Sequence, residues 1–336
     1  MGTTTPSHDQ PPPRDPASAG PTLHRRAFLA WAGALTAAAA APRVASAQGG
    51  VDSLTARQAA SRLLAQCTFG ADLDLIDEVA SSGAEAWIDA QQALPLRPLL
   101  PEVVALIESG ATGVEDEYVA FDWVWWQRAM TAPDVLRLRV AFALSQIFVI
   151  SRREDTLFDY AIAPAAFHDA LLRGAFGNFK DLLRDVTLSP SMGLYLSHLN
   201  NRRSDPSLNR FPDENYAREV MQLFTIGLYE LHPDGTRKLD GAGQPIATYG
   251  NAEITEMAKI FTGLTMAPEP GEPVEFGLEQ ETFDRPMVMV EAEHEPGPKT
   301  LLGGFTVPAG QSGLEDIESA LDHLFRHPNV GPFIGT

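Results

Sequence analysis

Apolar residues recur at three- and four-residue steps over most of the chain from Thr55 onward. Ala59, Leu63 and Leu64 show the pattern in the first such segment, and Val135 to Ser151 is apolar enough for a central buried helix. This spacing places the apolar side chains on one face of an α-helix. We therefore expect a mainly α fold, a multi-helix single domain over residues 55–336 whose core forms where these faces pack together.

Capping residues and prolines indicate where the helices begin and end. Asp72 is a helix N-cap residue, Gly83 suits the following C-terminus, and Ser312 to Glu315 form a capping box. The stretch from Pro95 to Pro101 breaks the chain. The expected helices cover residues 55–66, 72–82, 118–130, 135–151, 164–172, 179–186, 190–197, 251 to about 263 and from 312 onward, with a short helix around Trp87.

Two segments depart from the helical pattern. Residues 232–250, HPDGTRKLDGAGQPIATYG, hold two Asp-Gly turn signals and predict a hairpin or loop-rich insertion. Asp234 and Asp240 suggest a calcium loop, but the alternating oxygen ligands and closing Glu of an EF-hand are absent, which favours a plain loop. The run PMVMV predicts a small β element near residues 286–290.

The N-terminus has the order of an export signal. Arg25 and Arg26 precede a short alanine-rich apolar run, and Ala45-Ser46-Ala47 forms an A-x-A cleavage site. The paired arginines indicate the twin-arginine pathway, and the run is too short to span a bilayer. We therefore expect a periplasmic or extracellular protein without an integral membrane span. The expected organisation is a disordered leader over residues 1–24, the signal over 25–47, a linker over 48–54 and the helical domain over 55–336.

The charge balance restricts the partners. The chain has 25 Lys and Arg against 44 Asp and Glu, a formal net charge of −19. Such a chain repels phosphate backbones and anionic lipid, so we expect no nucleic-acid partner. Cys67 is the single cysteine, which excludes an intramolecular disulfide. No nucleotide-binding glycine motif and no G-x-S-x-G nucleophile motif occurs, and no cofactor is evident.

The segment FDWVWW forms a cluster of aromatic residues that includes Phe121, Trp123, Trp125 and Trp126. An exposed cluster of this kind stacks against sugar rings, whereas aromatic residues at helical spacing belong more often to a core. We favour the core interpretation and leave the sugar platform open.

The segment PDENYAREVMQLFTIG, residues 212–227, begins with a group of polar residues that we call the polar head: Asp213, Glu214, Asn215, Arg218 and Glu219. A structural interpretation explains all of them. Acidic residues stabilise a helix N-terminus, and Glu214 pairs with Arg218 four residues later. The catalytic interpretation makes Glu219 a general base, Asn215 and Arg218 donors to developing charge, and Glu214 or Asp213 a second, glycosidase-like carboxylate.

Other polar residues extend the catalytic interpretation. His294 and Lys299 lie on a Gly- and Pro-rich loop that we expect at the rim of a cleft, with Arg203 as a further binding residue. His198, Glu219 and His294 together have the side chains that a divalent metal needs, although no H-x-x-x-H pair fixes such a site. A histidine in this setting is more often a hydrogen-bonded structural residue.

Six blocks of sequence together resemble an exported bacterial family catalogued as domain of unknown function 1800. In chain order they are RLLAQCTFGA, LRVAFALSQIFVIS, GNFKDLLRDVTLSPSMGLYLS, DENYAREVMQLFTIG, AEITEMAKIFTGLT and HEPGPKTLLGG, which extend from Arg62 to Gly304. The resemblance implies a helical exported protein, commonly encoded beside a sulfatase-like exported family. It also implies a longer chain, so residues 330–336, which look like the start of a further helix, are expected to belong to a C-terminally truncated member.

The resemblance to this family implies no particular reaction. Many members have a W-H-N-H-F block where this chain has residues 142–148, and both histidines are absent here, so no role of that pair transfers. Two hypotheses follow from the sequence. One is a hydrolase of an extracellular polymer such as a polysaccharide, which acts through the polar head. The other is a non-catalytic helical protein that binds a glycan, a metal or a neighbouring exported protein.

Overall fold

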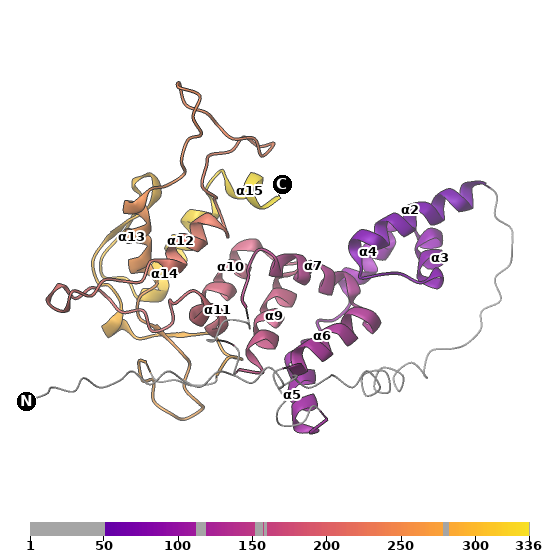
Figure 1. Ribbon diagram of the computed structural model, residues 1–336, viewed down its shortest axis with the longest axis horizontal. Helices are drawn as coiled ribbons and strands as arrows, with labels where there is room; N and C mark the ends of the chain where they lie inside the picture. Colours follow the sequence, from indigo (N-terminus) through magenta and orange to yellow (C-terminus); the bar gives the residue numbers. More distant parts are fainter. Residues whose placement is uncertain (1–50, 112–118, 152–156, 158–159, 278–281, 336) are drawn as a thin grey trace, which may run out of the picture. The chain divides into compact units, whose positions relative to one another are not determined.

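The computed structural model describes residues 51–111, 119–151, 157, 160–277 and 282–335 (Figure 1). Arg25, Arg26, Ala45 and Ala47, the residues of the expected export signal, lie outside the described residues. The chain from Gly50 onward forms one compact unit. None of the helices within the described part is long and apolar enough to cross a membrane.

The structure is mainly α, as the apolar spacing predicts. The helices are α2 (Val51–Cys67), α3 (Leu73–Ser82), α4 (Ala84–Ala93), α5 (Leu100–Glu108), α6 (Ala120–Thr131), α7 (Val135–Ser145), α9 (Ala163–Gly174), α10 (Phe179–Thr187), α11 (Pro190–Tyr195), α12 (Asn215–Gln222), α13 (Asn251–Ile260), α14 (Gly313–Phe325) and α15 (Val330–Gly335). Two small antiparallel pairs of strands accompany them: β1 (Leu264–Thr265) with β2 (Val288–Met289), and β3 (Lys299–Thr300) with β4 (Thr306–Val307). The β element expected near residues 286–290 is β2.

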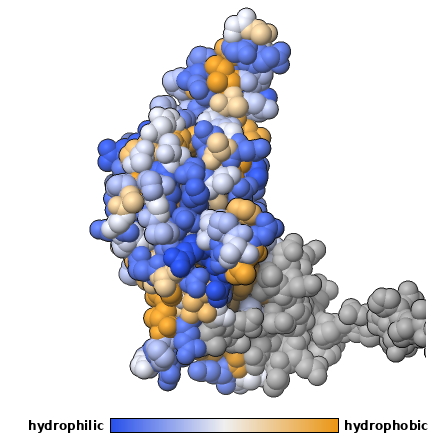
Figure 2. Space-filling model, turned by 90° about the vertical axis from the view of Figure 1, so that its left-hand side faces the viewer, coloured by the Kyte–Doolittle hydropathy of each residue, from blue (hydrophilic) through white to orange (hydrophobic). Residues whose placement is uncertain are grey.

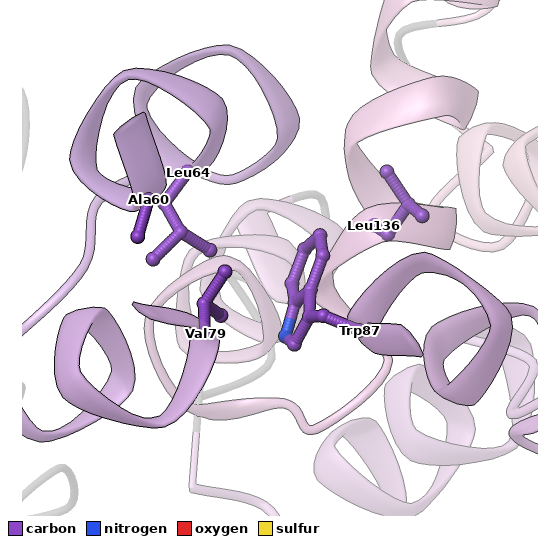
Figure 3. Close-up of a cluster of buried hydrophobic side chains, with 5 residues drawn as sticks. All are labelled: Ala60, Leu64, Val79, Trp87 and Leu136. Carbon is purple, nitrogen blue, oxygen red and sulfur yellow. The ribbon is translucent and has the colours of Figure 1, made fainter. Parts of the chain in front are cut away.

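Helices α2, α3, α4 and α7 share a hydrophobic cluster (Figure 3). The side chains of Ala60, Leu64, Val79, Trp87 and Leu136 are buried there, one or two from each helix, and the Trp87 ring lies between Val79 and Leu136. Burying a large indole removes more apolar surface from water than any aliphatic side chain does. The cluster therefore joins the first helices of the domain to α7.

Local capping occurs where the sequence indicates it. The Asp72 carboxylate accepts a hydrogen bond from Leu75 N at 2.8 Å, and the Ser312 hydroxyl accepts one from Glu315 N at 3.3 Å. At α13 the N-cap residue is Gly250. Asn251 is already helical, and Glu253 accepts a hydrogen bond from Gly250 N at 2.9 Å.

Helix α5 was not expected, because Pro95 to Pro101 suggested a break. Pro101 lies in the first turn, where its missing N–H costs no helical hydrogen bond. The cap comes from another helix: Asp169 of α9 accepts hydrogen bonds from Leu99 N at 2.6 Å and Leu100 N at 3.1 Å. Burial raises the pKa of this carboxyl, and the two N–H groups oppose that rise. Since the cap is 69 or 70 residues away in the chain, no local pattern could indicate it.

Helix α7 ends six residues earlier than expected. The apolar run continues to residue 151, but the chain leaves the helix after Ser145 and carries Phe148 into the centre of the domain. Phe148 is fully buried and contacts Phe179 and Phe224, with ring centroids 5.8 and 5.1 Å away. Apolar composition alone does not distinguish a helical turn from such a buried loop.

The segment between α12 and α13 forms the expected hairpin insertion and extends away from the neighbouring helices (Figure 1). Isolated antiparallel bridges join Tyr229 to Ala247, Leu231 to Arg237 and Leu239 to Pro245.

The carboxylates at the two turns of this insertion are used locally. Asp240 accepts hydrogen bonds from Ala242 N and Gln244 N, and Asp234 accepts one from Thr236 N. Such contacts stabilise turns by themselves.

Candidate functional site

The first turn of α12 uses Asp213 to hold the backbone. Its carboxylate accepts a hydrogen bond from Asn215 N at 2.8 Å, and its own N–H donates to Asn201 Oδ1 at 2.9 Å. The Asn215 side chain donates to Ser197 Oγ at 3.3 Å. Two polar-head residues thus connect α12 to the segment that follows α11.

Glu214 and Arg218 form the pair that their four-residue spacing predicts. Their side chains approach to 3.6 Å and are 41% and 42% exposed. Glu214 also accepts a hydrogen bond from Thr255 Oγ1 at 2.8 Å, which links α12 to α13. Both groups therefore have partners that agree with the structural interpretation of the polar head.

Glu219 differs from the other acidic residues of the polar head. Its side chain is half-buried, and its Oε2 atom is buried without a hydrogen-bond partner among the described residues. Burial raises the pKa of this carboxyl, while the neighbouring Arg218 opposes the rise. Burial also raises the pKa of Tyr249, and the charge of Glu219 adds to that rise. A carboxyl with a raised pKa beside polar neighbours has the property of a general acid.

His294 and Lys299 lie in the interior, not at a cleft rim as expected. They are 3% and 1% exposed and surround Asp316 of α14. His294 Nε2 lies 3.0 Å from Asp316 Oδ2 and 3.2 Å from Lys299 Nζ, which donates to that same carboxylate oxygen. Gln311 Nε2 donates to Asp316 Oδ1 at 3.0 Å. We call His294, Lys299 and Asp316 the buried ion cluster.

The buried ion cluster connects loop and helix. His294 Nδ1 donates to Thr262 O at 2.9 Å, Lys299 Nζ also donates to Glu295 O, and Asp316 belongs to the first turn of α14. Asp316 was not among the sequence candidates, because an acidic residue in a first turn is explained by the helix dipole. The remaining predicted binding residue, Arg203, is exposed, and its backbone N–H donates to Glu293 O at 2.9 Å.

His198 is buried beneath the ring of Tyr216, with the two ring centroids 3.9 Å apart and nearly parallel. Its Nε2 donates to Thr187 O at 2.9 Å, and its Nδ1 has no partner among the described residues. Burial lowers the pKa of His198 to about 4. The structure does not bring His198, Glu219 and His294 together, and nowhere in the described residues do three His, Cys, Asp or Glu side chains form a group that could hold a metal.

A cavity of about 710 Å³, which we call the aromatic cavity, lies among α2, α6, α7 and α9. Helix α6 lines it with Phe121, Asp122, Trp125 and Trp126, and α9 adds His168. The end of α2 and the following turn contribute Ala65, Thr68, Phe69 and Gly70, whereas α7 and its C-cap contribute Arg139, Phe142, Ser145 and Gln146. The last three residues come from the segment where the family resemblance places a W-H-N-H-F block.

The aromatic rings of the cavity hold each other edge to face. Phe69 lies 5.1 Å from Trp125 and 5.8 Å from Phe142, and Trp125 lies 5.4 Å from Trp126, all measured between ring centroids. Aromatic pairs prefer this geometry, which fixes the ring positions before any ligand arrives.

The aromatic residues of the FDWVWW segment, which lies on α6, are divided between core and surface. Phe121 is 7% exposed and agrees with the core interpretation, whereas Trp126 is 58% exposed and does not. The face shown in Figure 2 is mostly hydrophilic, with small separate hydrophobic patches. Scattered exposed apolar residues need no functional explanation, but an exposed tryptophan beside a large aromatic-walled cavity does.

A smaller cavity of about 290 Å³ is lined by charged residues that already have partners. Asp169 caps α5, Arg173 lies 3.8 Å from Asp185, and Arg285 pairs with Glu269 at 2.8 Å. The aromatic cavity is therefore the stronger candidate for a ligand site.

A family model described as "Protein of unknown function (DUF1800)" matches residues 62–336. No curated protein and no solved structure matches the chain.

We expect the buried ion cluster to stabilise the fold. Lys299→Met leaves Asp316 without its ammonium partner, and breaking a buried pair in this way costs roughly 3–5 kcal/mol of unfolding free energy. Lys238→Met is the matched control, because Lys238 pairs with Glu230 at the surface and such pairs contribute about 1 kcal/mol or less. Urea denaturation of both variants measures the difference, and equal losses would contradict the assignment.

His198 should make stability depend on pH. Its pKa is about 4 when folded and about 6.5 when unfolded, so the unfolded chain binds more protons between these values. The neutral His198 ring therefore contributes roughly 3 kcal/mol to the free energy of unfolding above pH 6.5, and this contribution is lost as the pH falls to 4. His198→Phe should remove this part of the slope, as measured by urea denaturation at several pH values. His323→Phe, a half-buried ring stacked on Phe305, is the control, and an unchanged slope in His198→Phe would disprove the idea.

Proposed function

Because the chain belongs to the DUF1800 family, whose description assigns no activity, we propose a function from the geometry of the site. We propose that this is an exported binding protein that holds a sugar unit of an extracellular polysaccharide in the aromatic cavity. The observation that carries the proposal is the exposed Trp126 beside a cavity whose walls are Trp125, Phe69 and Phe142.

The composition of the cavity suits a sugar. A pyranose ring has an apolar face of C–H groups and an edge of hydroxyl groups, so it needs both aromatic faces and hydrogen-bonding side chains. Asp122, Arg139, Gln146 and His168 supply the polar groups among the aromatic rings. A volume of about 710 Å³ also lies within the range of small-molecule sites, roughly 300–1,000 Å³.

The proposal also includes a location outside the cytoplasm and a partner protein. The paired arginines and the A-x-A site at the N-terminus support a destination outside the cytoplasm, where polysaccharides are available. The sulfatase-like exported protein that the family resemblance implies is a second proposed partner, since such enzymes act on ester groups of polymers.

Replacing Trp126 should weaken glycan binding. Trp126→Ala removes the most exposed aromatic face of the cavity, and aromatic contacts of this kind cost about tenfold or more in affinity when removed. Isothermal titration against a panel of soluble polysaccharides measures this. Phe211→Ala is the control, because Phe211 is 67% exposed and does not line the cavity. If no polysaccharide binds, or if Trp126→Ala binds as well as the parent, the proposal is wrong.

A hydrolase that acts through the polar head is the second candidate function. Its support is Glu219, whose raised pKa and buried, unpartnered Oε2 within the described residues suit a general acid, with Arg218 beside it. The other acidic residues of the polar head are already engaged, so Glu219 has the leading role in this version.

The hydrolase candidate is tested by a screen of polysaccharides and esters, with and without added divalent metal ions. Glu219→Gln should abolish turnover while circular dichroism shows an intact fold, because an amide cannot transfer the proton. Glu214→Gln is the matched control, since Glu214 is held by Arg218 and Thr255. Unchanged turnover in Glu219→Gln would exclude this role.

A further inference from the structure

We propose that Arg139 makes the aromatic cavity selective for a sugar that carries a carboxylate, such as a uronic acid unit of an acidic polysaccharide. This inference rests on the proposed glycan-binding function and names its ligand class. It begins from the placement of one guanidinium group among the aromatic walls.

The Arg139 guanidinium is held in place by aromatic rings and by one hydrogen bond. Its central carbon lies 5.7 Å from the centroid of the Phe69 ring and 5.4 Å from that of Phe142. Its Nε donates to Gln66 O at 3.3 Å. Contacts between a cation and aromatic rings at these distances are attractive, and the half-buried side chain is therefore pre-organised.

The terminal nitrogens of Arg139 remain available. Neither Nη atom has a hydrogen-bond or ion-pair partner among the described residues, and the side chain lines the cavity. Two neighbouring arginines are used differently. Arg128 pairs with Glu102 at 2.6 Å and Asp134 at 3.1 Å, and Arg137 donates to Leu172 O at 3.3 Å while it lies over Phe176.

A fixed guanidinium with two available nitrogens is the complement of a carboxylate. The planar fork donates two parallel hydrogen bonds to the two carboxylate oxygens, which a lysine ammonium cannot reproduce. A charge-assisted contact of this kind is stronger than a hydrogen bond between neutral groups. Asp122 lines the same cavity, but a carboxylate does not attract another carboxylate, so recognition of an acid belongs to Arg139.

The net negative charge of the chain excludes long-range attraction as the source of a preference for acidic sugars. A formal net charge of −19 repels polyanions at long range, so an acidic polysaccharide gains nothing from non-specific attraction. A preference for an acidic sugar over a neutral one must then come from a local cation in the site.

The test compares oligosaccharides that differ only in the acid group. Trp125 and Trp126 line the cavity, so quenching of tryptophan fluorescence reports binding of a uronic acid oligosaccharide, its neutral counterpart and a sulfated counterpart. We expect the parent protein to bind the uronic acid form about tenfold or more tightly than the neutral form, as charge-assisted hydrogen bonds predict. Arg139→Lys should lose most of that preference, because a lysine ammonium cannot donate two parallel hydrogen bonds to a carboxylate.

The controls separate the possible results. Arg202→Lys is the matched control, because Arg202 also lies over an aromatic ring, that of Phe276, but outside the cavity, and it should leave all affinities unchanged. Equal affinity for acidic and neutral forms, or a preference that survives Arg139→Lys, overturns the inference and leaves the proposed function intact. Tighter binding of the sulfated form overturns the choice of a carboxylate. If no oligosaccharide binds, the proposed function fails, and this inference fails with it.

Discussion

Buried backbone groups need hydrogen-bond partners, and in this protein polar side chains distant in sequence supply many of them. Asp169 satisfies the first N–H groups of α5, and Asn201 holds both backbone groups of Asp213 before α12. Asn329 donates to Ile226 O and Tyr229 O and accepts from Leu231 N. The first two contacts lie where α5 and α12 begin, and the Asn329 contacts hold the segment that follows α12.

The same constraint explains the buried charges. Removing a charged group from water is costly unless a partner and further hydrogen bonds surround it. Asp316 meets this condition with Lys299, His294 and Gln311, and it connects α14 to the loop before β3. Residues that look like ligands in the sequence are therefore structural where their donors and acceptors are already engaged. Glu219 and Arg139 differ, because each keeps polar atoms without partners among the described residues, as does the fully buried His198.

The two candidate sites make different use of the fold. The polar head lies on one short helix and the two residues before it, and most of its groups bind α13 or the segment after α11. The aromatic cavity collects side chains from four helices, and it keeps Trp126 exposed where burial would stabilise the domain. An arrangement that leaves apolar surface exposed around a cavity is more easily explained by a ligand than by stability.

The sequence by itself determined the helical class, the small β element, the hairpin insertion and the family, because apolar periodicity, turn residues and motif blocks are local. It also placed the caps at Asp72 and Ser312, whose partners lie three residues away. Only the tertiary structure decided that His294 is buried and Trp126 exposed, and that α5 is capped by Asp169. Periodicity shows which face of a helix is apolar, but burial depends on which faces meet, and that is settled by contacts between residues far apart in the chain.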